Sequence, residues 1–139
     1  MKKCGIALLA AGKGTRMGLD FPKALAPLLG KKLIDFGIEV VDDFSKSASL
    51  TPHFGVVVGH QKEQVLDHLN QNYSLRLNQD ITTAWQQQQL GTADALRSYF
   101  DQTPDAWLCP YTLVLCADTP LLTADVLMEL YKKLEQQQD

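Results

Sequence analysis

An apolar run that passes directly into a glycine-rich loop constrains this chain more than any other feature, and both lie within residues 5–23. The run covers Ile6–Ala11, and the residues after it include three glycines and three cations: Gly12, Gly14, Gly18, Lys13, Arg16 and Lys23. This pattern predicts a strand buried on both faces that ends in a tight turn. Glycines let a backbone approach a ligand closely, and cations beside backbone N–H groups attract phosphate. We therefore predict a phosphate site after the first strand; a tight turn with solvated charges is the alternative.

The composition indicates one ordinary globular domain. Of the 139 residues, 45% are hydrophobic and 21% are charged, which suffices for a single core. The net charge is −3 and the isoelectric point about 5.5, so the chain has no overall basic surface. We therefore predict one domain over residues 1–139 that does not bind nucleic acid.

The cysteines and the N-terminus indicate a cytoplasmic protein. The three cysteines, Cys4, Cys109 and Cys116, are odd in number and form no CxxC pair, which argues against a disulfide framework or a zinc site. The first apolar run is short and is followed at once by Lys13 and Arg16, unlike a signal peptide. No stretch approaches the roughly 18 apolar residues of a membrane span, so we expect no membrane partner.

Strand patterns alternate with helix patterns along the whole chain. We expect strands at about residues 5–10, 54–59, 81–86 and 111–117, and helices at about 32–44, 61–70, after 91 and after 123. Such alternation predicts a mostly parallel sheet. The expected fold is α/β, a Rossmann-like three-layer arrangement with helices on both faces of the sheet.

The two later helices have visible start signals. We expect Thr92 to be the N-cap of the third helix and Thr123 the N-cap of the last. Helical spacing predicts two buried faces, the first formed by Ala93, Leu96 and Phe100 and the second by Val126, Leu127, Leu130, Tyr131 and Leu134.

Polar or glycine-containing segments follow every expected strand. Residues 12–23 follow the first strand, Gly59-His60 the second, residues 86–92 the third, and Asp118 the fourth. Ligands of parallel α/β sheets bind outside the carboxyl ends of the strands. These segments are therefore the candidate site.

Neither of the two commonest phosphate motifs fits the loop. A P-loop would need glycine at position 7 and a hydroxyl at position 14, but the chain has Ala7 and Gly14. A dinucleotide fingerprint would need its third glycine at position 17, where the chain has Met17.

The pattern that does fit is Leu-Ala-Ala-Gly-x-Gly-x-Arg-Met followed by Pro-Lys. It covers residues 9–17 and 22–23, and Gly59-His60, Gln86, residues 89–92 and Asp118 with Pro120-Leu121 follow in the same order. With these motifs the chain resembles the sugar-phosphate nucleotidyltransferases (MobA-like NTP transferases). It is most similar to the uridyltransferase domain of bacterial N-acetylglucosamine-1-phosphate uridyltransferase.

The resemblance implies an enzyme that transfers a nucleotidyl group from an NTP, here UTP, to N-acetylglucosamine-1-phosphate with Mg²⁺. It implies that Arg16 and Lys23 are catalytic, Arg16 with Gly14 on the β- and γ-phosphates and Lys23 on the α-phosphate. Gln86, Gly91 and Thr92 would read the base, and Asp118 would be the metal ligand. The implied substrate-binding set is Leu9, Ala10, Ala11, Gly12, Gly14, Lys23, Gln86, Gly91, Thr92, Cys116, Ala117 and Asp118.

The chain departs from the family pattern at two residues and in length. Ala117 stands where the family usually has glycine, and Asp94 replaces a common histidine. The resemblance covers only the nucleotide-binding half of the family's domain, so we expect an incomplete nucleotidyltransferase domain whose sheet edge or apolar face favours self-association.

Four alternatives remain open. The chain could be a non-catalytic nucleotide-binding module, or a related cytidylyl-, guanylyl- or thymidylyltransferase. Residues 86–89 could be a solvated polar tract, and Asp118 could only begin a turn. The three histidines show no ligand spacing, which argues against a metal role for them.

Overall fold

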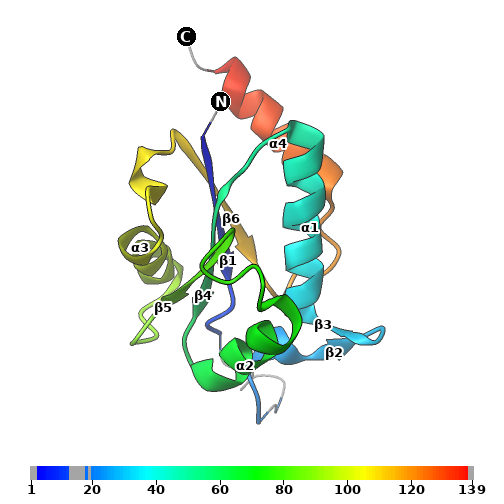
Figure 1. Cartoon of the computed structure of the whole chain (residues 1–139), viewed down its shortest axis with the longest axis vertical. Coiled ribbons are helices and arrows are strands. Elements are labelled where there is room, and N and C mark those ends of the chain that lie inside the picture. Colours follow the sequence, from blue (N-terminus) through cyan, green and yellow to red (C-terminus); the bar gives the residue numbers. More distant parts are fainter. Residues whose placement is uncertain (1–2, 13–17, 19, 138–139) are drawn as a thin grey trace.

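The centre of the molecule is a parallel sheet, seen in a computed structural model that describes residues 3–12, 18 and 20–137. Its strands are β1 (Cys4–Leu9), β4 (His53–Val58), β5 (Ile81–Trp85) and β6 (Tyr111–Cys116). Their spatial order is β5-β4-β1-β6, and every neighbouring pair is parallel. A small antiparallel hairpin, β2 (Pro27–Leu28) and β3 (Lys31–Lys32), lies to one side of this sheet (Figure 1).

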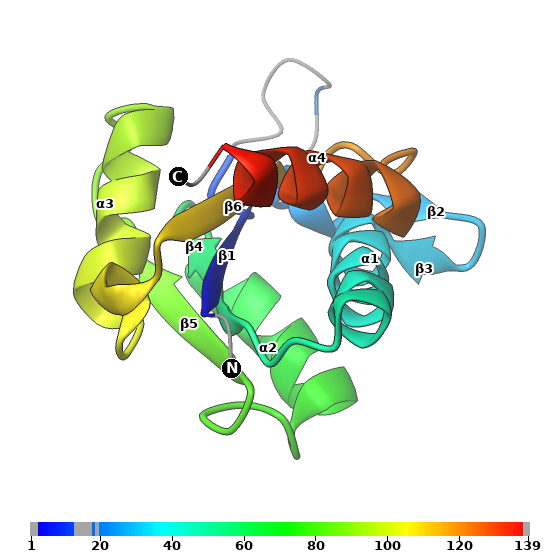
Figure 2. The same ribbon diagram turned by 90° about the horizontal axis from the view of Figure 1, so that it is seen from above.

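Helices cover both faces of the sheet. On one face lie α1 (Leu33–Ala48), α2 (Lys62–Tyr73) and α4 (Ala124–Gln136), and on the other lies α3 (Thr92–Gln102) (Figure 2). The described residues also form two 3₁₀ turns, η2 (Lys23–Leu25) and η3 (Ala106–Leu108). The expected α/β, Rossmann-like three-layer fold is confirmed.

The two faces of the sheet carry side chains of different size. Large residues of the strands, such as Ile6, Leu8 and Val56, meet buried residues of α1, α2 and α4 in the main core. The opposite face is lined by small residues such as Ala7 and Ala84, so α3 packs closely against it. This alternation follows from the period of two along a strand.

Tyr99 of α3 fills the space that small residues leave on that face. A Cβ added at Gly55 would lie 2.7 Å from the Tyr99 ring, and one at Gly5 would lie 2.6 Å from the Tyr99 hydroxyl oxygen. That hydroxyl donates to the backbone oxygen of His53 at 2.7 Å. The tyrosine is therefore buried with its polar atom satisfied.

The third helix begins and packs differently from the prediction. Its N-cap is Gly91, with φ 104°, and Thr92 is already its first residue, so the predicted Thr92 cap is wrong. The predicted buried face is only partly right: Ala95 and Tyr99 are the buried residues of α3, and the predicted Leu96 and Phe100 pack against their cluster. Of the three residues predicted for this face, Ala93 is exposed and Leu96 and Phe100 are partly buried.

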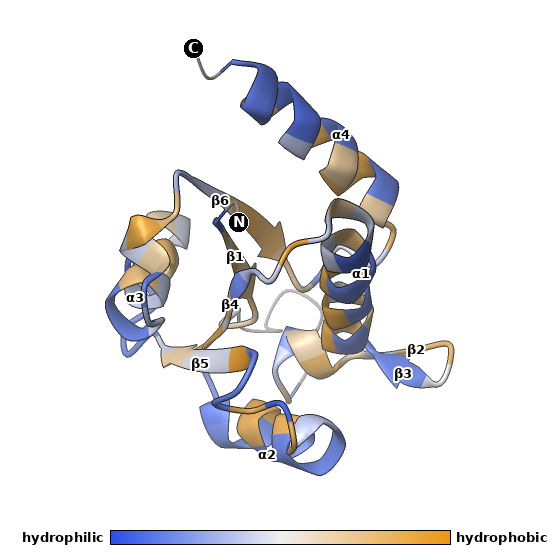
Figure 3. Cartoon of the chain, turned by 45° about the horizontal axis from the view of Figure 1, so that its top comes forward, coloured by the Kyte–Doolittle hydropathy of each residue, from blue (hydrophilic) through white to orange (hydrophobic). Residues whose placement is uncertain are grey.

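The last helix agrees better with its prediction. Thr123 caps α4, since its hydroxyl accepts the backbone N–H of Val126. Leu127 and Tyr131 are buried as expected, but Val126 and Leu130 stay about half exposed. Figure 3 shows that α4 becomes hydrophilic toward its C-terminal end.

Strand β6 is covered on one face only. Leu113 and Leu115 enter the main core, whereas Val114 on the opposite face is 40% exposed because α3 packs over β4 and β5 instead. Among the described strands, β6 is also an edge of the sheet. No described helix is both long and apolar enough to cross a membrane.

Candidate functional site

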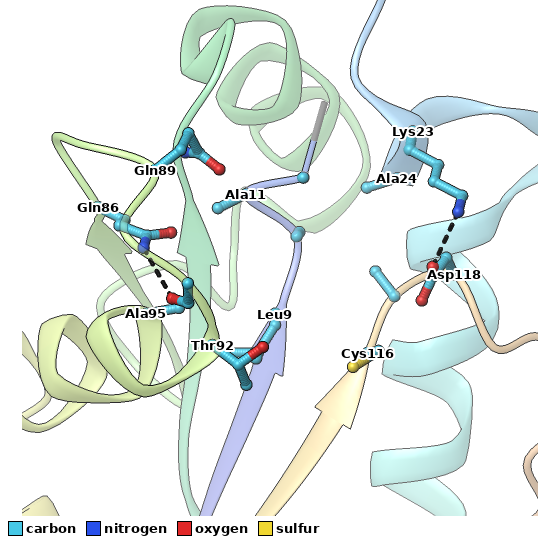
Figure 4. Close-up of a pocket in the computed structure, with 14 residues that line it drawn as sticks. Leu9, Ala11, Lys23, Ala24, Gln86, Gln89, Thr92, Ala95, Cys116 and Asp118 are labelled. Atoms are coloured by element: carbon cyan, nitrogen blue, oxygen red, sulfur yellow. Dashed lines mark hydrogen bonds and ion pairs between the residues drawn. The ribbon is translucent and has the colours of Figure 1, made fainter. Parts of the chain in front are cut away.

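A pocket of about 340 Å³ opens at the carboxyl ends of β1 and β6, opposite the N-terminus of α3 (Figure 4). The order in which the strands are added reverses between β1 and β6. From β1 the chain passes through α1 to β4 on one side, and later it passes through α3 to β6 on the other side of β1. Such a reversal is where parallel α/β sheets bind ligands. The lining residues are Leu9, Ala10, Ala11, Gly12, Lys23, Ala24, Gln86, Gln89, Gly91, Thr92, Ala95, Cys116, Ala117 and Asp118.

The floor of the pocket is backbone held from both sides. The Ala10 N–H donates to the Val57 oxygen at 2.8 Å, and the Ala117 N–H donates to the Leu9 oxygen at 2.9 Å. These bonds continue the two ladders of β1 past the end of the strand. Because β1 is central, its last residues form a rigid platform for whatever enters the pocket.

One wall carries an ion pair. The Lys23 Nζ lies 3.0 Å from Asp118 Oδ2, and the two side chains are 35% and 39% exposed. Lys23 begins η2 immediately after Pro22, whose fixed φ sets the start of that turn. Asp118 follows β6 in a turn that the Thr119 hydroxyl closes by donating to the Cys116 oxygen at 2.7 Å. Figure 4 shows Lys23 and Asp118 on the side of the pocket opposite Gln86.

The other wall carries a buried amide. Gln86 follows β5 and is only 3% exposed. Its backbone N–H extends the ladder to Val58 at 2.8 Å. Its side-chain Nε2 donates to the Gly91 oxygen at 3.2 Å and to Asp94 Oδ2 at 3.0 Å. The predicted polar contact residue is therefore a fixed part of the wall and not a solvated tract.

Cys116, the last residue of β6, and Ala117 directly after it line the pocket near Asp118. Removal of water from around the thiol, together with the negative charge of Asp118, raises the pKa of Cys116. The thiol is therefore protonated at neutral pH and is not a nucleophile. Ala117 is buried, with its backbone N–H already used in the ladder to β1.

Asp118 is the one carboxylate among the lining residues. The part of the chain that the structure describes holds no group of three or more residues that could bind a metal by themselves. Mg²⁺ commonly takes only one or two protein carboxylates together with phosphate oxygens and water. A half-exposed carboxylate beside an open pocket fits that use, provided that phosphate supplies other ligands.

The structure brings together eleven of the predicted site residues: Leu9, Ala10, Ala11, Gly12, Lys23, Gln86, Gly91, Thr92, Cys116, Ala117 and Asp118. Gly14 and Arg16 lie outside the described residues, so their predicted roles stay predictions.

Sequence reasoning left out Ala24, Ala95 and Asp94. Ala24 and Ala95 line the pocket as small residues, and Asp94 supports Gln86 from behind. Gly59 does not line the pocket but lets it form, because a Cβ there would lie 2.8 Å from that of Ala11. The only signal for Asp94 in the sequence was its departure from the histidine of the family pattern.

The fold and the pocket define a Rossmann-like α/β protein with a pocket at the carboxyl ends of a parallel sheet. Residues 6–139 match the family of the MobA-like NTP transferase domain. The chain therefore belongs to this family of nucleotidyltransferases.

The matches to curated relatives cover nearly the whole of this chain but only part of each relative. The chain is 37% identical over 131 residues to the bifunctional protein GlmU of an Exiguobacterium species, covering 94% of this chain and 26% of the relative. It is 39% identical over 127 residues to the bifunctional protein GlmU of Prochlorococcus marinus, covering 91% of this chain and 26% of the relative. The chain thus spans about a quarter of the length of the curated relatives it matches.

Solved structures support the same fold. Rv0371c from Mycobacterium tuberculosis H37Rv superimposes with a TM-score of 0.61 at 15% identity, covering 94% of this chain and 60% of that chain. A UDP-glucose pyrophosphorylase complexed with UDP-glucose gives a TM-score of 0.60 at 23% identity, covering 97% of this chain and 54% of that chain. At these identities the likeness shows the fold alone.

Proposed function

We propose that this chain carries the nucleotide-binding site for nucleotidyl transfer from an NTP to a sugar-1-phosphate. The products are an NDP-sugar and pyrophosphate, with UTP and N-acetylglucosamine-1-phosphate as the proposed pair. One observation carries the proposal: a single pocket joins a buried amide beside a helix N-terminus to the Lys23–Asp118 pair on its far wall. The membership of the family and the resemblance to the uridyltransferase domain support the choice of reaction.

In the proposed complex, the two walls of the pocket bind different parts of the nucleotide. The base lies against Gln86 and the first turn of α3, and the ribose lies over the end of β1. The phosphates then reach Lys23 and Asp118, with Gly14 and Arg16 holding the β- and γ-phosphates. Arginine suits this role because its planar fork binds phosphate at two points.

In the proposed reaction, a phosphate oxygen of the sugar-1-phosphate attacks the α-phosphorus while the bond to the β-phosphate oxygen breaks. Lys23 neutralises charge that develops on the α-phosphate, and Arg16 neutralises the leaving pyrophosphate. Positioning and charge neutralisation dominate such reactions. A Mg²⁺ bound at Asp118 would supply further charge neutralisation on the phosphate oxygens.

The ion pair between Lys23 and Asp118 fits this division of roles. Both partners are more than a third exposed, so solvent screens their attraction and the pair contributes only about 0–1 kcal/mol. Opening the pair therefore costs little. Lys23 is then free to follow the phosphate, and the Asp118 oxygens are free to meet a cation.

The first test is release of pyrophosphate from UTP and N-acetylglucosamine-1-phosphate with Mg²⁺. We expect Lys23→Ala and Arg16→Ala each to reduce the rate at least about tenfold, since each removes a charge from a phosphate. Lys132→Ala, which removes an exposed cation from α4, is the matched control and should leave the rate unchanged. CTP, GTP and TTP in place of UTP test the related transferases. Equal rates for the pocket variants and the control would contradict the proposed roles.

A second candidate is a nucleotide-binding module without turnover. It is favoured by the described pocket, because every role proposed for its lining residues concerns the donor nucleotide. Calorimetry would then detect UTP binding, weakened by Arg16→Ala, while no pyrophosphate is released. Turnover by these 139 residues alone would exclude this candidate.

The proposal includes two properties of the whole protein. It places the chain in the cytoplasm, where nucleoside triphosphates are available. It also includes self-association of two copies along β6, whose outer edge and one face are uncovered in the described structure.

A further inference from the structure

We propose that Asp94 is a specificity-determining residue of this site, because it holds the Gln86 amide with its carbonyl oxygen toward the pocket. The pocket then accepts a base whose edge presents an N–H beside a carbonyl, as uracil does. It rejects cytosine, which presents a ring nitrogen acceptor beside an amino group. This inference rests on the proposed function, since it requires a nucleotide base in the pocket.

The orientation of the amide follows from the chemistry of its neighbours. Nε2 lies 3.0 Å from Asp94 Oδ2 and 3.2 Å from the Gly91 oxygen. A carboxylate and a backbone carbonyl are acceptors only, so both demand the NH₂ end of the amide. Turning the amide over would place Oε1 against two oxygens at hydrogen-bonding distance.

Asp94 is the stronger of the two holding groups. Its bond to Gln86 is the shorter one and is assisted by the charge of the carboxylate. The Gly91 oxygen is neutral, and it already accepts the backbone N–H of Ala95 at 3.1 Å. Removal of Asp94 therefore removes most of the preference for one orientation of the amide.

The other end of the amide is left for a ligand. Gln86 is 97% covered, yet no hydrogen bond to its Oε1 occurs within the described part of the chain. Among the described residues, Oε1 is also not one of the fully buried polar atoms that lack a partner. Figure 4 shows this oxygen turned toward the space between the two walls. A base without a donor at this position would leave the acceptor unpaired.

Hydrogen-bond donors stand beside this acceptor. The first N–H groups of α3 have no acceptors within the helix, and no side chain caps them. Gly91 and Thr92 at this helix end line the same wall as Gln86. An acceptor next to donors complements a carbonyl next to an N–H, which is the order on uracil. Cytosine has the reverse order at both positions.

The test compares the affinities for UTP and CTP, which differ at this edge alone. Calorimetry is carried out on the 139-residue chain and on Asp94→Ala and Asp94→Asn, with Asp101→Ala as the matched control. Asp101 lies on the same helix and contributes the same charge, but its nearest ionic partner is Arg97. Circular dichroism establishes that each variant is folded.

We expect the parent chain and Asp101→Ala to bind UTP at least about tenfold more tightly than CTP, since a buried acceptor rejects a base that leaves it unpaired. In Asp94→Ala the ratio should fall by at least about threefold, since the freed amide can turn to suit either base while the backbone N–H groups of α3 still favour a carbonyl. Asp94→Asn should give an intermediate ratio, because its amide can either accept or donate. If Asp94 had only a structural role, its substitution would weaken the binding of UTP and CTP equally and leave the ratio of their affinities unchanged.

The outcomes separate this inference from the function on which it rests. If the parent chain bound UTP and CTP equally, or if Asp94→Ala and Asp94→Asn kept the parent ratio, the role of Asp94 would be overturned while nucleotide binding stood. If the parent chain bound no nucleoside triphosphate, the proposed function would fail and this inference with it.

Discussion

At the scale of single residues, Asp35 is a charge that the fold holds by several hydrogen bonds. Its carboxylate accepts from His68 at 2.8 Å, from the Tyr73 hydroxyl at 2.7 Å and from the Lys32 backbone N–H at 2.9 Å. Burial raises the pKa of Asp35, but the hydrogen bonds from His68, Lys32 and Tyr73 outweigh burial and lower it overall. The carboxylate thereby joins the start of α1 to α2.

This network predicts a pH-dependent contribution to stability. Because the pKa of Asp35 is lower in the folded than in the unfolded chain, its stabilisation is fully present above the ordinary carboxyl pKa of about 4 and is lost in more acidic solution. Asp35→Asn should lower the free energy of unfolding by about 1–3 kcal/mol at pH 7. Urea titrations from pH 7 to pH 3 should show this difference shrinking. A difference that stays constant with pH would show that the charge is not responsible.

The same scale shows what the sequence can and cannot predict about the site. The sequence predicted that Leu9, Gln86 and Asp118 would lie together because each stands at or just after the end of a strand, and parallel strands end at one edge. Asp94 was not predictable, since it meets Gln86 across an irregular loop where neither helical nor strand spacing applies. Side-chain pairs of this kind require the three-dimensional arrangement.

At the scale of elements, the placement of α3 depends on glycine in the strands below it. A Cβ at Gly55 would lie 2.6 Å from the Thr103 hydroxyl oxygen and 2.7 Å from the Tyr99 ring. The packed Tyr99 ring and the end of α3 at Thr103 cannot move freely. The distance between α3 and β4 therefore requires glycine at position 55. Because α3 also forms one wall of the pocket, its height above the sheet affects the site.

We therefore predict that Gly55→Ala destabilises the protein by about 1–3 kcal/mol, as overpacking of a core commonly does. Chemical denaturation measures this effect. Gly12→Ala is the matched control for stability, because its Cβ meets no described atom within 4 Å. Equal stability of the two variants would mean that α3 can shift outward without loss.

The error in the predicted buried face of α3 has a physical origin. The buried face of α3 was assigned to Ala93, Leu96 and Phe100 because helical spacing was counted on apolar residues alone. The structure instead buries Tyr99, whose hydroxyl finds an acceptor on β4. The four strands of the main sheet were predicted well since their apolar runs are short and contiguous, whereas the two-residue strands β2 and β3 were not predicted.

At the scale of the whole molecule, the sheet is protected unequally at its edges. The β6 edge presents unpaired backbone groups, and Val114 beside it is 40% exposed. Exposed apolar edge strands are sites where chains pair with one another. We predict that the protein associates as its concentration rises, as measured by light scattering, and that Val114→Lys reduces this association. A monomer at every concentration tested would contradict the prediction.

The position of β1 has a consequence for how the protein acquires its structure. Cys4 on β1 pairs with Tyr111 on β6, although residues 5–110 lie between them. Such distant pairing requires closure of a long loop before any contact is gained, and this slows folding. During synthesis, the N-terminal strand must therefore wait with one side unpaired until β6 has emerged. Because the pocket lies between these two strands, a nucleotide that binds there would recognise only chains that have completed this last step.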